Sequence, residues 1–286
     1  MGLNTIMHKR TDPAPSSSVT DGKIIDSLDI EIQSILKDKV HCRKIRYLSD
    51  GLRIVGFILR PRVLSGRHPV LIFNRAGKLE EGKIAERTLN YLSLLASHGY
   101  VVLATQYRGN DGGEGREAFG GDDINDVMHL ITLAENLPYA DSSRLGMLGY
   151  SRGGMMTFLA AKLGAPLKAA AVIGAPTDLI QIYQDRDDIK PALKTLIGGP
   201  PSELRDEYVR RSAAFWPERL NVPLLILHGE ADWRVKAEQS RVLVRRLQEL
   251  DSPHEFKIFA NSDHNLSLHR QERNAAIFQW FDGHLK

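Results

Sequence analysis

Short apolar segments alternate with mostly helical ones over most of the chain, and this alternation limits the fold more than any other sequence feature. Six segments have the length and composition of buried strands: Val70–Phe73, Val101–Ala104, Leu145–Leu148, Ala169–Ile173, Leu224–Leu227 and Phe256–Phe259. Strands that alternate with helices predict a parallel sheet covered by helices on both faces. We therefore expect an α/β fold with a mostly parallel central sheet.

The N-terminal region departs from this pattern. Residues 1–22 contain two prolines and three consecutive serines, a composition that predicts a flexible tail. From Lys23 to Lys37, apolar residues recur at helical spacing and predict an amphipathic helix. Asp50-Gly51 between two apolar runs predicts a β-hairpin. No inner linker interrupts residues 23–286, which we expect to form a single domain.

One connection is too long to join two strands simply. Residues 177–220 contain Gly198-Gly199-Pro200-Pro201 and a predicted helix over Ser202–Arg211. Insertions of this length above a parallel sheet form either a lid over a site or a plain structural excursion, and the sequence is compatible with both.

Charge and composition narrow the classes of partner. The 38 basic and 35 acidic side chains give a net charge of +3, too balanced for the basic footprint of a nucleic-acid-binding protein. No run of eighteen apolar residues predicts a membrane span. The single Cys42 excludes an intramolecular disulfide and a multi-cysteine zinc site, and favours a reducing compartment. We expect a cytoplasmic protein that acts on a small molecule without membrane, nucleic acid, metal or cofactor.

The segment Gly149-Tyr150-Ser151-Arg152-Gly153 fits the G-x-S-x-G nucleophile elbow. The pentapeptide alone is weak, but a predicted strand ends just before Ser151 and a predicted helix, from Gly154 to Leu163, follows it. An elbow needs this context, because the serine sits on a strained turn between a strand and a helix. The two flanking glycines avoid a collision across that tight bend. Ser151 is the candidate nucleophile.

A serine needs a base to take its proton and an acid to orient the base. On folds with this elbow the chain order is serine, acid, histidine, with each residue after a strand. Asp232 follows the strand Leu224–Leu227 and His264 follows Phe256–Phe259, so both have the required order and position. We predict the triad Ser151, Asp232 and His264.

Rival residues exist for the acid and the base. Glu230 lies near Asp232, Asp263 adjoins the histidine, and Asp178 follows the strand Ala169–Ile173, where some hydrolases place their acid. His228 also follows a strand, but its position immediately before Gly229 favours a role in supporting the loop that carries Asp232. His254 lies before a predicted strand and His269 lies inside a helical stretch, so neither follows a strand.

Together these segments resemble the prolyl oligopeptidase family of the α/β-hydrolase fold. The resemblance covers about Val70 to Leu285 and includes several motifs: Tyr107-Arg108-Gly109, Leu137-Pro138-Tyr139-Ala140-Asp141, Gly149 to Gly154, Ile197-Gly198-Gly199-Pro200 and Leu227 to Asp232 with Val235. It implies the same nucleophile, acid and base. Large members carry a β-propeller before the hydrolase domain, and this chain has no room for one.

The resemblance also implies an oxyanion hole. The backbone N–H of Arg152, just after the nucleophile, is one expected donor. Where the family often has a tyrosine between glycines, this chain has Arg75 in the segment Phe73-Asn74-Arg75-Ala76-Gly77. Either the backbone N–H or the guanidinium of Arg75 is then the second donor, with a salt bridge at the cleft rim as an equal alternative.

These residues predict a serine hydrolase that cleaves an ester or amide bond through an acyl-enzyme. Because the propeller is absent, small carboxylic esters are slightly favoured over short peptides. An oligopeptidase or aminopeptidase is the alternative, and acyl transfer to an alcohol or amine would differ only in the acceptor. A non-catalytic binding module on a hydrolase scaffold is the hypothesis of a different class.

Overall fold

The computed structural model describes residues 20–286, so most of the predicted flexible tail, residues 1–19, lies outside the described part. Nine strands in this part form one mixed sheet in the order β1-β2-β3-β5-β4-β6-β7-β8-β9. The strands are β1 (Ile24–Asp29), β2 (Val40–Ser49), β3 (Leu52–Pro61), β4 (His68–Asn74), β5 (Val101–Thr105), β6 (Ala140–Tyr150), β7 (Ala169–Ile173), β8 (Leu224–Gly229) and β9 (His254–Phe259). The six strands from β5 to β9 along this order pair in parallel, as the alternating pattern predicts, while β1, β2 and β3 are antiparallel.

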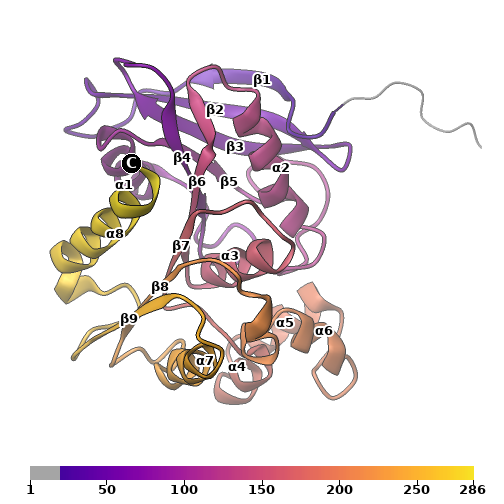
Figure 1. Ribbon diagram of the computed structural model, residues 1–286. Coiled ribbons are helices and arrows are strands. Elements are labelled where there is room, and N and C mark those ends of the chain that lie inside the picture. Colours follow the sequence, from indigo (N-terminus) through magenta and orange to yellow (C-terminus); the bar gives the residue numbers. More distant parts are fainter. Residues whose placement is uncertain (1–19) are drawn as a thin grey trace, which may run out of the picture.

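Helices cover both faces of the sheet (Figure 1). The α-helices are α1 (Glu86–Ser97), α2 (Ile124–Glu135), α3 (Arg152–Lys162), α4 (Leu179–Asp185), α5 (Lys190–Ile197), α6 (Arg205–Arg210), α7 (Glu238–Glu249) and α8 (Arg270–Leu285), and the 3-10 helices are η1 (Ala213–Phe215), η2 (Pro217–Arg219) and η3 (Ser267–His269). Helices α1 and α8 pack on one face with Leu95 and Phe281, and α2, α3 and α7 pack on the other. Each face therefore has its own apolar core.

The predicted helix over Lys23–Lys37 is wrong. Residues 24–29 form strand β1, which pairs antiparallel with β2, and no helix follows before β2. Leu28 is 68% exposed and Ile35 is 99% exposed, so the apolar residues at helical spacing do not share a buried face. Pairing with the edge of β2 satisfies the backbone polar groups of this segment, and that gain overrides a short helical pattern.

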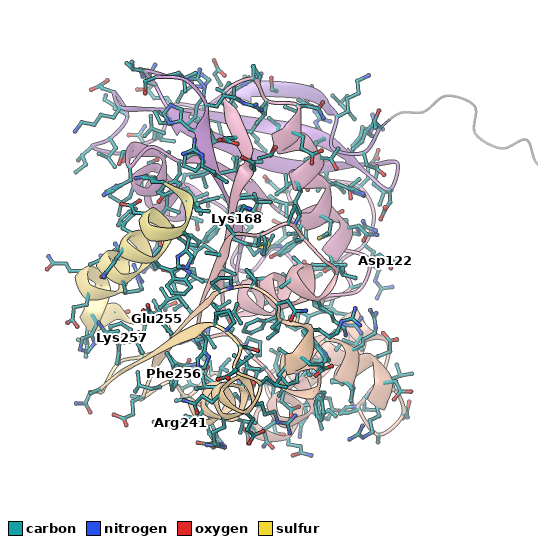
Figure 2. All side chains as sticks on the ribbon, in the orientation of Figure 1. Asp122, Lys168, Arg241, Glu255, Phe256 and Lys257 are labelled. Atoms are coloured by element: carbon teal, nitrogen blue, oxygen red, sulfur yellow. The ribbon has the colours of Figure 1, made fainter. Side chains whose placement is uncertain are left out.

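Other predicted elements are present. Asp50 and Gly51 turn the β2–β3 hairpin with φ values of 52° and 75°. The helix expected over Ser202–Arg211 is the shorter α6. Strand β9 forms one edge of the sheet, where the exposed Glu255 and Lys257 flank Phe256 (Figure 2). Among residues 20–286, no helix has both the length and the apolar character needed to cross a membrane.

Candidate active site

Ser151 occupies a sharp turn between β6 and α3. Its φ of 51° and ψ of −122° are unfavourable for a residue with a side chain, so the surrounding structure must hold it there. Its backbone N–H donates to the carbonyl of Ile173 on β7 at 2.8 Å. A Cβ atom on Gly153 would collide with the carbonyl oxygen of Asn74, and one on Gly149 would collide with that of Gly153. The strand, turn and helix therefore follow the predicted elbow, and both flanking glycines are required by close packing.

Asp232 and His264 lie in contact at the ends of β8 and β9. Oδ2 of Asp232 is 2.7 Å from Nδ1 of His264, and its Oδ1 accepts the backbone N–H groups of Arg234 and Val235 at 2.9 and 3.0 Å. The carboxylate is only 4% exposed and is therefore held in one orientation. Because Oδ2 accepts a hydrogen bond from the N–H at Nδ1, the lone pair at Nε2 of His264 is available to act as a base.

His228 also contacts the carboxylate of Asp232. Its ring is buried, with Nε2 3.2 Å from Oδ2 of Asp232 and 2.8 Å from the carbonyl of Val235, and Nδ1 2.7 Å from Oγ of Ser240. Burial alone would raise the pKa of Asp232, but hydrogen bonds from His228 and His264 lower it well below its ordinary value. Asp232 is therefore ionised throughout the neutral range, as an orienting acid requires.

Close backbone packing positions the histidine loop. A Cβ atom on Gly174 would lie 3.0 Å from Nδ1 of His264, so the ring rests against the backbone after β7. The N–H of Ala231 donates to the carbonyl of Ser262 at 3.0 Å. This bond joins the loop that carries Asp232 to the loop that carries His264. The loops that follow β7, β8 and β9 thus pack against one another beside the His264 ring.

The rival acids have other partners. Asp178 caps α4, where Oδ1 accepts the N–H groups of Ile180 and Gln181 at 2.8 and 3.1 Å. Asp263 accepts the backbone N–H and the hydroxyl of Ser267 at 2.7 and 2.8 Å. Glu230 lies 3.7 Å from Arg241 on the surface. Of these carboxylates, only that of Asp232 contacts the His264 ring.

Ser151 and His264 line the same cavity, which has a volume of about 140 Å³. One part of its wall is apolar, and another carries cations. The lining residues are Ala76, Gly77, Lys78, Glu81, Phe119, Ser151, Arg152, Pro176, Leu179, Ile182, Arg186, Ile189, Arg234, Val235, His264 and Asn265. Within residues 20–286, no hydrogen bond joins Ser151 Oγ to the His264 ring. Such bonds are often long before substrate binds and tighten in the complex.

The two residues expected at the oxyanion hole differ in their surroundings. Arg152 is the first residue of α3, so its backbone N–H has no acceptor within the helix, and the residue lines the cavity. The guanidinium of Arg75 points away: it donates to the carbonyls of Gln106 and Leu79, each at 2.9 Å, and lies 3.4 Å from Glu117. Arg75 is 1% exposed, so its ion pair is buried rather than at the cleft rim, and its side chain does not fit the role of a donor.

A sequence model of the prolyl oligopeptidase family matches residues 87–286. The protein YtmA of Bacillus subtilis, named an uncharacterised peptidase, is 33% identical over 222 residues, which cover 77% of this chain and 84% of YtmA. Human dipeptidyl peptidase 8 is 26% identical over 235 residues, which cover 77% of this chain but only 26% of that protein.

Solved structures of other hydrolases are similar to this chain. The acylaminoacyl peptidase of Pyrococcus horikoshii superimposes with a TM-score of 0.77 and 26% identity, over 87% of this chain and 42% of its own. Acetyl xylan esterase 1 of Thermoanaerobacterium has a TM-score of 0.65 and 18% identity, over 92% and 88% of the two chains, and this likeness concerns the fold alone. The chain thus spans less than half of the Pyrococcus enzyme but most of YtmA.

Proposed function

The chain belongs to the prolyl oligopeptidase family and is a serine-type hydrolase, and from this premise we propose that Ser151, His264 and Asp232 form its catalytic triad. One observation carries the proposal. The 2.7 Å contact between His264 and Asp232 leaves Nε2 free, and the same ring lines the cavity into which Ser151 opens. In this proposal Ser151 is the nucleophile, His264 is the base and Asp232 is the acid that orients the base.

The proposed reaction proceeds through an acyl-enzyme. Oγ of Ser151 forms a bond to the carbonyl carbon of the substrate while its proton passes to Nε2 of His264. The bond to the leaving alcohol or amine then breaks, and the leaving group takes that proton. Water next attacks the acyl carbon and gives its proton to His264. The bond between the acyl carbon and Oγ then breaks, the proton passes from His264 to Oγ of Ser151, and the acid is released.

Two backbone N–H groups stabilise the negative charge on the carbonyl oxygen in this proposal. Arg152 supplies the first from the start of α3. Ala76 supplies the second, because Ala76 is among the residues that line the cavity and Arg75 is not. The backbone N–H of Arg75 remains a sequence-based alternative. Such donors contribute most when they are fixed before charge develops.

The proposed substrate is a short peptide or a small ester. A cavity of about 140 Å³ suits a small acyl group, and Leu179, Ile182 and Ile189 provide its apolar wall. These three residues come from the long connection 177–220, which we therefore assign to substrate binding. The peptidase names of YtmA and of the Pyrococcus enzyme support amide substrates, while the small cavity supports the esters favoured by the sequence. The single Cys42 supports a cytoplasmic location.

A substrate panel tests this proposal. We expect the purified chain to hydrolyse p-nitrophenyl acetate and butyrate, or aminoacyl and prolyl p-nitroanilides, and Ser151→Ala to hydrolyse neither group. A strong preference for the anilides would make the protein a peptidase and overturn the preference for esters. Equal turnover by the wild type and Ser151→Ala would exclude the triad.

A further inference from the structure

Four buried charged side chains lie directly behind the nucleophile elbow. Arg75, Glu117, Asp123 and Arg152 are each no more than 2% exposed. Nη1 of Arg152 is 2.5 Å from Glu117, Nη2 of Arg152 is 2.5 Å from Asp123, and Nη2 of Arg75 is 3.4 Å from Glu117. Two cations and two anions therefore neutralise one another in the interior of the protein. Removing one charge from such a group leaves another without a partner.

Glu117 is the member that joins the two walls of the cavity. On one side it accepts the backbone N–H of Leu79, 3.0 Å from each carboxylate oxygen, and pairs with Arg75. On the other side it accepts a hydrogen bond from Arg152, the residue after the nucleophile. Asn110 donates a further bond to it at 2.7 Å. Segment 75–79 and the start of α3 are thus linked by this carboxylate, and also by Nη1 of Arg152, which donates to the carbonyl of Gly77 at 3.2 Å.

Asp123 does not make the same connection. It accepts the N–H groups of Gly120 at 2.9 Å and Ala118 at 3.3 Å, and it pairs with Arg152, but it makes no hydrogen bond to segment 75–79 among the described residues. The Arg152 guanidinium also lies over the rings of Tyr107 and Phe119, 4.5 and 4.8 Å from their centroids. These contacts hold the Arg152 side chain in place. Glu117 then links that side chain to segment 75–79, because it also accepts the backbone N–H of Leu79.

The cations in this group depend on their acid partners. Burial and the nearby Arg152 guanidinium lower the pKa of Arg75, so the charged form of Arg75 is held there against an unfavourable environment. Glu117 supplies negative charge to both arginines. A neutral amide in its place would retain hydrogen-bonding atoms but not that charge.

We propose that Glu117 is a positioning residue that fixes the distance between the backbone N–H groups of Ala76 and Arg152. The inference rests on the proposed function, in which these groups form the oxyanion hole. Among residues 20–286, Glu117 makes no hydrogen bond to Ser151, and it is not one of the residues that line the cavity. Because the hole acts on charge that develops in the transition state, a shift of its donors should lower kcat more than it changes KM.

Glu117→Gln is the variant that tests this inference, and Asp126→Asn is its matched control. Asp126 is also fully buried and ion-paired, with Oδ1 2.8 Å from Nη2 of Arg108. Its hydrogen bonds go to Arg108 and Ser49, not to segment 75–79 or Arg152. Both variants replace a buried carboxylate by its amide, so both should lower the thermal midpoint.

We expect kcat of Glu117→Gln to fall about 100-fold, with KM within about threefold of the wild type, since misplaced catalytic groups cost rates of this order. Asp126→Asn should keep kcat within about threefold. The substrate is the best ester or anilide of the panel, and kcat is divided by the fraction of chains that a fluorophosphonate labels. This division removes the contribution of unfolded protein.

The outcomes separate the two proposals. Equal kcat for Glu117→Gln and Asp126→Asn, in an active wild type, would overturn the role of Glu117 and leave the triad untouched. A wild type without turnover or labelling would overturn both. If Glu117→Gln does not fold, Asn110→Ala keeps the carboxylate and removes the 2.7 Å bond to it, together with the bonds from Asn110 to the carbonyls of Tyr107 and Arg108 at 3.4 and 3.1 Å. A loss of kcat at constant KM in that variant supports the inference, and an unchanged kcat contradicts it.

Discussion

Nδ1 of His264 lies 2.7 Å from Oδ2 of Asp232, although the two residues are 32 positions apart in the sequence. The carboxylate is held by backbone N–H groups on one oxygen and by two histidines on the other. In the proposed triad, this contact determines which nitrogen of His264 is available as a base. Loss of the carboxylate should therefore affect catalysis far more than substrate binding.

Asp232→Asn tests this contact. An amide in this position can donate a hydrogen bond to Nδ1 and so favours the tautomer in which Nε2 carries the hydrogen, as in other serine hydrolases with this change. We expect kcat to fall by about 10⁴-fold with little change in KM. Steady-state kinetics at pH 7 checks this, with Asp178→Asn as the control because Asp178 only caps α4. A larger loss in Asp178→Asn would assign the acid to the rival position.

The lowered pKa of Asp232 has a consequence for acid stability. Its folded-state pKa lies below the ordinary aspartate value of 3.8, so the ionised group stabilises the fold above that value. As the pH falls from about 4 through the folded-state pKa, this contribution is lost. We expect the difference in free energy of unfolding between wild type and Asp232→Asn to shrink over this range. Urea titrations from pH 3 to pH 6 measure it, and a difference that grows on acidification would refute the prediction.

Gly153→Ala should disrupt the elbow. The added Cβ would collide with the carbonyl of Asn74, and backbone atoms cannot move aside as a side-chain end can. We expect a loss of at least about 3 kcal/mol in the free energy of unfolding, the upper end of overpacking costs.

Gly283→Ala is the matched control for that change. Gly283 is an exposed glycine within α8, and a Cβ there would meet no atom within 4 Å. Alanine should raise stability by up to about 1 kcal/mol because it favours helix. Chemical denaturation of the two variants gives both values, and equal effects would show that close packing at Gly153 is not the cause.

Much of the fold follows from local sequence patterns. Strands such as Ala169–Ile173 are short apolar runs between helical segments, and the residues after them, including Asp232 and His264, gather at one edge because parallel strands end there. The residues of the proposed triad were therefore predictable as side chains that follow strand ends. Their contact distance was not, since it depends on how the loops pack.

Other features depend on partners far away in the sequence. Residues 24–29 carry a helical pattern but form β1 because β2 offers an unpaired edge, which a local pattern does not reveal. Glu117 lies 35 positions before Arg152 in a loop without a motif, so its link between two walls appears only in the folded chain. Arg75 matched a position in the family, yet the carbonyls around it bind its guanidinium in the interior.

Covalent labelling tests the central claim most directly. We expect a fluorophosphonate to add one adduct to the folded wild type, with the modified peptide containing Ser151, and to add none to folded Ser151→Ala. Intact-mass measurement followed by peptide mapping gives both results. An unlabelled wild type, or an equal adduct on Ser151→Ala, would contradict the assignment of Ser151 as the nucleophile.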